Sequence, residues 1–86
     1  MIVVYPSSQF RKSFKKLPRA VQKKAERRDE MFRESPFIPI LETHKLGGKL
    51  KDYWAYSVDE HYRVLFRFEK GNKVLYFDIG THEIYK

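Results

Sequence analysis

The sequence predicts an α+β fold in which two N-terminal helices pack on one face of a small antiparallel sheet, in the order β-α-α-β-β-β. Two amphipathic helical patterns lie within residues 8–34, and three β-rich segments separated by turn residues lie within residues 52–79. Helices and strands that are segregated along a chain are typical of two-layer α+β folds. Because 86 residues are too few to bury two cores, we expect residues 1–86 to form a single domain.

The N-terminal part is predicted to form a short strand followed by two basic helices. Residues 2–5 are β-branched or aromatic and Pro6 follows them, which fits a brief strand. Two serines can then cap a first helix, whose apolar residues recur at i, i+4 and i+7. Pro18 suits the first turn of a second helix that runs to about Glu34 and has only a narrow apolar face.

The C-terminal part is predicted to be a connector and a three-stranded meander. Prolines and a Gly-Gly pair interrupt helical phasing over residues 35–50. The three β-rich segments that follow span residues 52–58, 62–69 and 73–79. Side chains alternate along a strand, so the middle segment points His61, Arg63 and Arg67 to the face opposite the core. We expect that face to be cationic and free to bind.

Charge and composition favour a polyanionic partner. The formal net charge is +7 and the pI is near 9.7, which is in the range of nucleic-acid-binding domains. There is no cysteine, so neither disulfides nor thiolate metal sites contribute to stability. The N-terminal residues lack a signal-peptide pattern and no apolar run reaches membrane-spanning length, so we expect a cytoplasmic protein.

Three histidines are candidates for proton transfer in RNA cleavage. His44, His61 and His82 all lie in the β-rich half. Histidine can take or give a proton near neutral pH, and a 2′-hydroxyl that loses its proton can attack the adjacent phosphate without a cofactor. The histidines lack HxH or HxxxH spacing, so we predict no metal site and no cofactor. The alternative interpretation is that each histidine is an ordinary surface residue. The basic helices would then present solvated faces or dock an acidic protein.

The sequence resembles the RelE/ParE toxin superfamily of bacterial toxin–antitoxin modules over essentially its whole length. The resemblance rests on the basic helices, the Leu46-x-Gly48 loop, the Tyr-Arg-Val-Leu-Phe strand at 62–66 and the Asp-Ile-Gly-Thr-His-Glu-Ile-Tyr ending at 78–85. His-x-Leu-x-Gly at 44–48 and Gly-Thr-His at 80–82 are most similar to the RelE/YafQ branch. That branch consists of mRNA interferases that cut mRNA in the 30S A site of the ribosome.

The resemblance implies a microbial-RNase-like fold, metal-independent cleavage by attack of the 2′-hydroxyl, and inhibition by a cognate antitoxin. The toxin–antitoxin complex would bind operator DNA through the antitoxin. By position, Arg63 matches a phosphate-binding strand arginine, and His82 and His44 match functional histidines of the branch. His82, with His61 or His44, would then move protons. The phosphate and the RNA would be held by Arg63 and by Lys49, Lys51, Arg67, Tyr85 and Lys86.

The chain departs from the family pattern at four positions, and two other functions stay open. Ser57 and His61 stand where YafQ has a histidine and an aspartate, and Trp54 and Tyr56 stand where RelE has two lysines. One alternative is a ParE-like, non-enzymatic inhibitor of DNA gyrase, against which the Gly-Thr-His ending argues. The other is a catalytically inactive protein that only binds RNA or the ribosome.

Overall fold

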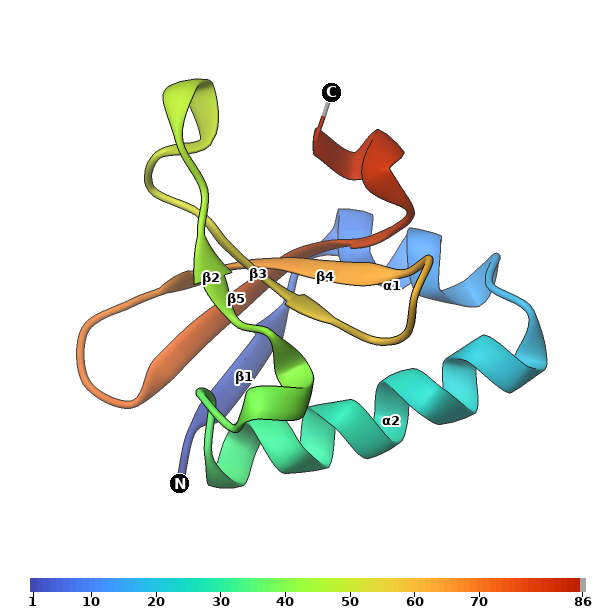
Figure 1. Ribbon diagram of the computed structural model, residues 1–86, viewed down its shortest axis with the longest axis horizontal. Coiled ribbons are helices and arrows are strands. Elements are labelled where there is room, and N and C mark those ends of the chain that lie inside the picture. The colour runs from blue at the N-terminus through green and yellow to red at the C-terminus, as the bar shows by residue number, and fades with distance from the viewer. Residues whose placement is uncertain (86) are drawn as a thin grey trace.

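A computed structural model describes residues 1–85 of the chain, which form two helices and five strands (Figure 1). The helices are α1 (Ser8–Lys15) and α2 (Arg19–Glu34), and the strands are β1 (Val3–Pro6), β2 (His44–Lys45), β3 (Trp54–Ser57), β4 (Arg63–Phe68) and β5 (Lys73–Gly80). Short 3₁₀ helices span Pro39–Leu41, Gly48–Leu50 and His82–Tyr85. Within residues 1–85, no helix has the length and apolar character needed to cross a membrane.

The strands form one sheet in the order β1-β5-β4-β3-β2. The predicted α+β class is confirmed, with the β3-β4-β5 meander antiparallel as expected. The sheet as a whole is mixed, because β1 joins β5 in parallel, with Val3 opposite Lys73. A parallel neighbour requires a long crossover, and the intervening helices and strands supply it. The predicted connector at 35–50 contains β2, which pairs through only two residues.

The core lies between the helices and one face of the sheet. Figure 1 shows α2 running beneath the sheet, with the β2–β3 loop and the last 3₁₀ helix on the opposite side. Phe32 of α2 is fully buried, and its ring centroid lies 4.8 Å from those of Tyr56 and Phe66. Phe10 of α1 lies 5.2 Å from Tyr76 of β5. The apolar faces predicted for the two helices are therefore the ones that pack on the sheet.

Ser7 fixes the start of α1 and ties it to β5. Its hydroxyl accepts a hydrogen bond from the backbone N–H of Phe10 at 3.0 Å, as an N-cap does, and donates to the carbonyl oxygen of Phe77 at 2.7 Å. Nearly two turns later, Ser13 donates to the carboxylate of Asp78 at 2.6 Å. The helix is thus held along the second half of β5, the part of the strand that leads into the C-terminal residues.

The sheet face away from α2 is partly covered. Ala55 and Leu65 are directly opposite each other on β3 and β4 and are buried, although they lie outside the cluster that packs against the helices. Tyr53, just before β3, packs on Phe77 of β5 with ring centroids 5.3 Å apart, and this contact spans β4. The guanidinium of Arg67 lies 5.8 Å from the Tyr53 ring. The expectation that this face is entirely free is therefore wrong.

Candidate functional site

Arg63 and His82 lie in direct contact on the face of the sheet opposite α2. Arg63 begins β4 and pairs with Gly80, the last residue of β5, and the final 3₁₀ helix begins at His82. Nη2 of Arg63 lies 3.2 Å from Nε2 of His82. Arginine has no acceptor, so Arg63 donates and the His82 imidazole accepts at Nε2, which is the neutral form with its proton on Nδ1. A neutral imidazole with a lone pair at Nε2 is the form that a general base requires.

Gly80 allows the last 3₁₀ helix to fold back toward this contact. A Cβ atom at residue 80 would lie 2.8 Å from Cγ2 of Ile84, a separation that Cβ atoms do not tolerate. With glycine at this position, the turn after β5 is tight enough to bring residues 82–85 over the start of β4. From the sequence alone, Gly80 was recognisable only as the first residue of the Gly-Thr-His motif at 80–82. Nothing in the sequence indicated its contact with Ile84.

Tyr85 completes a group of three side chains with Arg63 and His82. Its ring centroid lies 5.9 Å from that of His82. Burial raises the pKa of Tyr85 above its ordinary value, and the positive charge of Arg63 opposes that rise. The Tyr85 hydroxyl and Nε of Arg63 are buried and, within residues 1–85, have no hydrogen-bond partner. Buried polar groups are usually paired, and both of these unpaired donors lie beside the Arg63–His82 contact.

His44 lies on the same face of the sheet, on β2. It pairs with Ala55 of β3, which pairs with Leu65 of β4, so its backbone lies two strand spacings, about 10 Å, from β4. Nδ1 of His44 lies 2.9 Å from the carbonyl oxygen of Glu42. A carbonyl only accepts, so Nδ1 donates and Nε2 is left exposed to solvent. His44 therefore faces the Arg63 side of the sheet but does not touch Arg63 or His82.

The structure does not place His61 with Arg63 on a strand face, and that expectation is wrong. His61 lies in the turn between β3 and β4 and is exposed. The carboxylate of Asp59 accepts hydrogen bonds from the backbone N–H of His61 at 2.8 Å and of Tyr62 at 2.9 Å. This Asx turn bends the chain before β4 begins at Arg63, so the strand alternation does not extend back to His61.

The other residues predicted to bind phosphate or RNA do not join the group of Arg63, His82 and Tyr85. Lys49 lies in the 3₁₀ helix of the β2–β3 loop and Lys51 follows it, and both are exposed on the side of the sheet that carries the C-terminal 3₁₀ helix (Figure 1). Arg67 lies about 13 Å along β4 from Arg63. It forms an ion pair with Glu69 at 3.1 Å, so its charge is already balanced. Lys86 lies outside the described residues.

A mixed five-stranded sheet with two helices on one face is also the fold of several solved toxin structures. Solved structures of such toxins confirm that resemblance at the level of the fold. YafQ from E. coli strain BL21(DE3) superposes with a TM-score of 0.75 at 17% identity, covering 99% of this chain and 98% of that one.

Two complexes of related toxins with their antitoxins match equally well. The RelE–RelB complex from Pyrococcus horikoshii OT3 gives a TM-score of 0.76 at 18% identity over 93% of both chains. The YoeB–YefM complex from Staphylococcus aureus gives 0.76 at 15% identity over 95% of this chain and 98% of that one. No protein-family model and no curated protein sequence matches the chain. The likeness is therefore one of fold.

Proposed function

We propose that this chain is the toxin of a type II toxin–antitoxin module and acts in the cytoplasm as a ribosome-dependent mRNA endonuclease. The observation that carries the proposal is the 3.2 Å contact between Arg63 and His82 on the sheet face opposite α2. It sets a cation that can bind phosphate beside an imidazole whose Nε2 lone pair is released when that contact is displaced, and these are the two groups that cleavage by a 2′-hydroxyl needs first. The shared fold with YafQ and RelE supports the same assignment.

In the proposed reaction, RNA displaces the Arg63–His82 hydrogen bond. Nε2 of His82 takes the proton of the 2′-hydroxyl, whose oxygen attacks the adjacent phosphorus. The P–O5′ bond breaks, leaving a 2′,3′-cyclic phosphate and a 5′-hydroxyl after the leaving oxygen gains a proton. Arg63 and the Tyr85 hydroxyl stabilise the charge that develops on the non-bridging oxygens. His44, with Nε2 exposed on the same face, is our candidate for the group that protonates the leaving oxygen.

The partners follow from the same proposal. Two of the matching structures are complexes named for a toxin and its antitoxin, RelE with RelB and YoeB with YefM, and a third is the E. coli DinJ–YafQ complex. By that analogy a cognate antitoxin binds this chain and carries the operator-binding part of the complex. Lys49 and Lys51 on the β2–β3 loop would contact mRNA in the 30S A site.

The proposal is tested by inducing the wild type, His82→Ala and His61→Ala in a bacterial host and mapping mRNA 5′ ends within minutes. We expect cuts inside translated codons with the wild type, their loss in His82→Ala, and no loss in His61→Ala, because His61 lies in the turn before β4 and not on the strand face that carries Arg63. Growth arrest with intact mRNA and trapped gyrase–DNA complexes would assign the chain to the ParE class instead. Absence of arrest would mean that it only binds RNA or the ribosome.

A further inference from the structure

Strand β5 contains one extra residue where it runs along β4. Two successive residues of β4 pair with Tyr76 and Asp78, which leaves Phe77 between them as the residue of a β-bulge. The burial along β5 changes phase at the same place. Side chains on one face of a strand are two residues apart, yet Tyr76 and Ile79 both belong to the core and are three apart. The bulge is therefore seen both in the pairing and in the packing.

The bulge determines which residue of β5 lies opposite Arg63. Beyond the bulge, Arg63 pairs with Gly80. Without the extra residue, each pairing on this side would shift by one and Ile79 would lie opposite Arg63. A shift of one residue also turns every side chain to the other face, so Ile79 would leave the core. The 3₁₀ helix that carries His82 would then start from a different position, so the 3.2 Å contact depends on the bulge.

Helix α1 supplies hydrogen bonds to the residues of the bulge. Strand β1 pairs with β5 only up to the residue before the bulge, and α1 lies beside β5 from there on. The Ser7 hydroxyl donates to the carbonyl oxygen of Phe77 at 2.7 Å. The Ser13 hydroxyl donates at 2.6 Å to the carboxylate of Asp78. The same carboxylate oxygen accepts the backbone N–H of Ile79 at 2.8 Å, so the polar groups around the bulge are paired.

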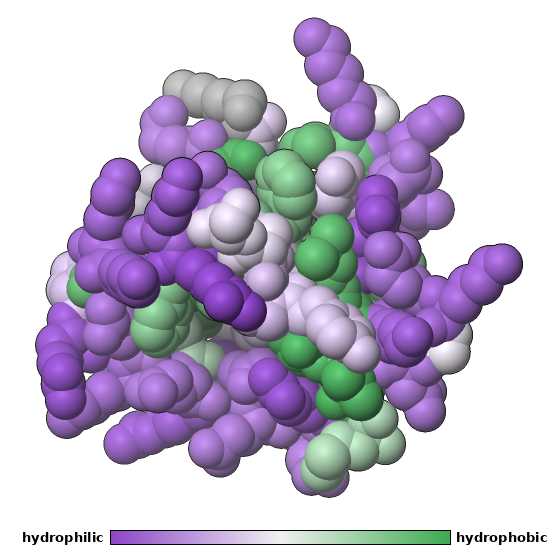
Figure 2. All heavy atoms as spheres, turned by 180° about the vertical axis from the view of Figure 1, so that it is seen from behind, coloured by the Kyte–Doolittle hydropathy of each residue, from purple (hydrophilic) through white to green (hydrophobic). Residues whose placement is uncertain are grey.

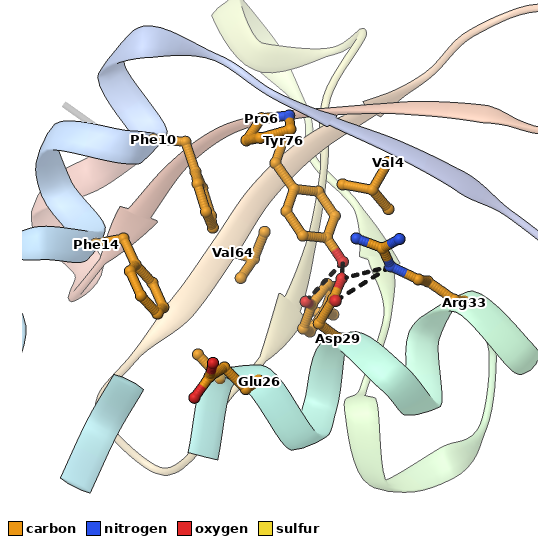
Figure 3. A pocket seen from close by; sticks show the side chains of 11 residues that line it. Val4, Pro6, Phe10, Phe14, Glu26, Asp29, Arg33, Val64 and Tyr76 are labelled. Carbon is orange, nitrogen blue, oxygen red and sulfur yellow. Dashed lines mark hydrogen bonds and ion pairs between the residues drawn. The ribbon is translucent and has the colours of Figure 1, made fainter. Parts of the chain in front are cut away.

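The apolar contacts of α1 are loose, which gives these hydrogen bonds more weight. Every residue of α1 is at least partly exposed, and in Figure 2, which shows the molecule from behind, the side chains around α1 are mostly hydrophilic. Figure 3 shows Phe10 and Phe14 reaching into an apolar pocket of about 180 Å³ that is also lined by α2. Protein interiors are normally close-packed. The looser packing here leaves the two serine hydrogen bonds to fix where α1 lies against β5.

We propose that Ser13 and Asp78 are positioning residues for His82. Their hydrogen bond holds the bulge against α1 and so maintains the register in which Gly80 lies opposite Arg63. They act on the reaction through the Arg63–His82 contact and not by touching RNA. Their effect on cleavage rests on the proposed function, whereas their effect on that contact does not.

The test compares Ser13→Ala, Asp78→Ala and Ser13→Thr with the wild type. Alanine favours a helix more than serine does, so Ser13→Ala does not weaken α1 itself. Ser13→Thr keeps the hydroxyl and is the rescue variant. Ser8→Ala is the matched control, because it makes the same change at an exposed residue of the same helix. Thermal denaturation verifies that each variant is folded at the assay temperature.

The first measurement is the tautomer of His82, read from side-chain ¹⁵N NMR spectra about two pH units above the ordinary histidine pKa of about 6.5. In the wild type and in Ser8→Ala we expect the proton on Nδ1, because Arg63 donates to Nε2. Ser13→Ala and Asp78→Ala should give a mixture of both tautomers, because the donor is no longer held at Nε2. Ser13→Thr should restore the wild-type spectrum. A loss of stability alone would leave the tautomer of the folded protein unchanged.

The second measurement is single-turnover RNA cleavage on programmed ribosomes. A displacement of about 1 Å can cost about 10²-fold, so Ser13→Ala and Asp78→Ala should cleave on the order of 10²-fold more slowly at saturating ribosomes, with the half-saturating concentration within about twofold. Ser13→Thr and Ser8→Ala should cleave like the wild type.

The inference is overturned if Ser13→Ala or Asp78→Ala keeps the wild-type tautomer, or if Ser13→Thr does not restore it. It is also overturned if the tautomer is lost while cleavage continues at the wild-type rate. A wild type that cuts no RNA would refute the proposed function alone. The NMR spectra would then decide whether α1 positions the contact.

Discussion

The contact between Arg63 and His82 predicts that the two side chains contribute to RNA cleavage as one unit. His82→Ala removes the proton acceptor, and a positioned acid–base group is worth about 10²–10⁴-fold in rate. Arg63→Ala removes the cation beside the phosphate, which is worth about 10²–10³-fold. Independent effects would multiply to a loss of about 10⁴–10⁷-fold in the double variant.

The structure predicts a smaller loss in the double variant, because each side chain positions the other across 3.2 Å. Contacting residues show interaction free energies of about 0.5–3 kcal/mol. At about 1.4 kcal/mol per tenfold, the double variant should therefore be about 2–150 times more active than the product of the single losses. Arg63→Lys should recover only part of the activity, because it keeps the charge but loses the guanidinium fork.

The assay is single-turnover cleavage of a short mRNA on programmed ribosomes, with 5′ ends read by primer extension. His61→Ala serves as the control and should cleave within about twofold of the wild type. If the double variant loses the full product of the single losses, the two residues act independently and the contact has no catalytic meaning. If His82→Ala cleaves at the wild-type rate, the histidine has no role in the reaction.

Three further predictions concern stability and the geometry of the site. Phe32→Ala should lower the free energy of unfolding by about 3–5 kcal/mol, because Phe32 is fully buried among aromatic rings, whereas Met31→Ala, at a residue 38% exposed, should change it far less in urea denaturation. Partial burial acts to raise the pKa of Asp59, but the hydrogen bonds from the backbone of His61 and Tyr62 and the charge of Lys24 outweigh it and lower that pKa. The stabilisation by Asp59 is therefore complete above its unfolded pKa of about 3.9 and is lost as the pH falls through the lower folded value. Asp59→Ala should cost about 1–3 kcal/mol at pH 7, and a difference from the wild type that does not shrink as the pH is lowered below about 3.9 would contradict this account. Gly80→Ala should displace Ile84 and with it His82, so cleavage should fall much more than the melting temperature, and unchanged cleavage would show that the 3₁₀ helix tolerates the shift.

Local signals in the sequence were sufficient to predict the helices. Ser7 caps α1 and the spacing of Phe10, Phe14 and Leu17 defines its buried face, all within about three turns of chain. The parallel pairing of β1 with β5 was not predictable in this way. It depends on partners such as Val3 and Lys73 that are far apart in sequence. The sequence of a four-residue strand does not indicate which strand it will pair with. Strand β2, with two residues, is shorter than any alternation can indicate.

The candidate site was predictable in its members but not in its arrangement. Arg63 and His82 were both singled out, and the structure joins them, although their roles remain predictions. His61 was placed on the wrong element, because the Asp59 turn that removes it from β4 depends on one side-chain carboxylate. The ion pair between Arg67 and Glu69 could not be predicted either. The alternation of side chains along a strand predicts the face on which a residue lies but not its partner.

The parallel pairing of β1 with β5 also determines when, during synthesis, the sheet can close. Val3 cannot pair with Lys73 until Lys73 has been synthesised. At a synthesis rate of about 5–20 residues per second, the delay between the two residues is about 4–14 s. Until then β5 is absent, β4 lacks one neighbour, and His82 has not yet been made. A nascent chain therefore cannot assemble the Arg63–His82 pair until His82 has emerged from the ribosome. The proposed cleavage activity would begin only after that point.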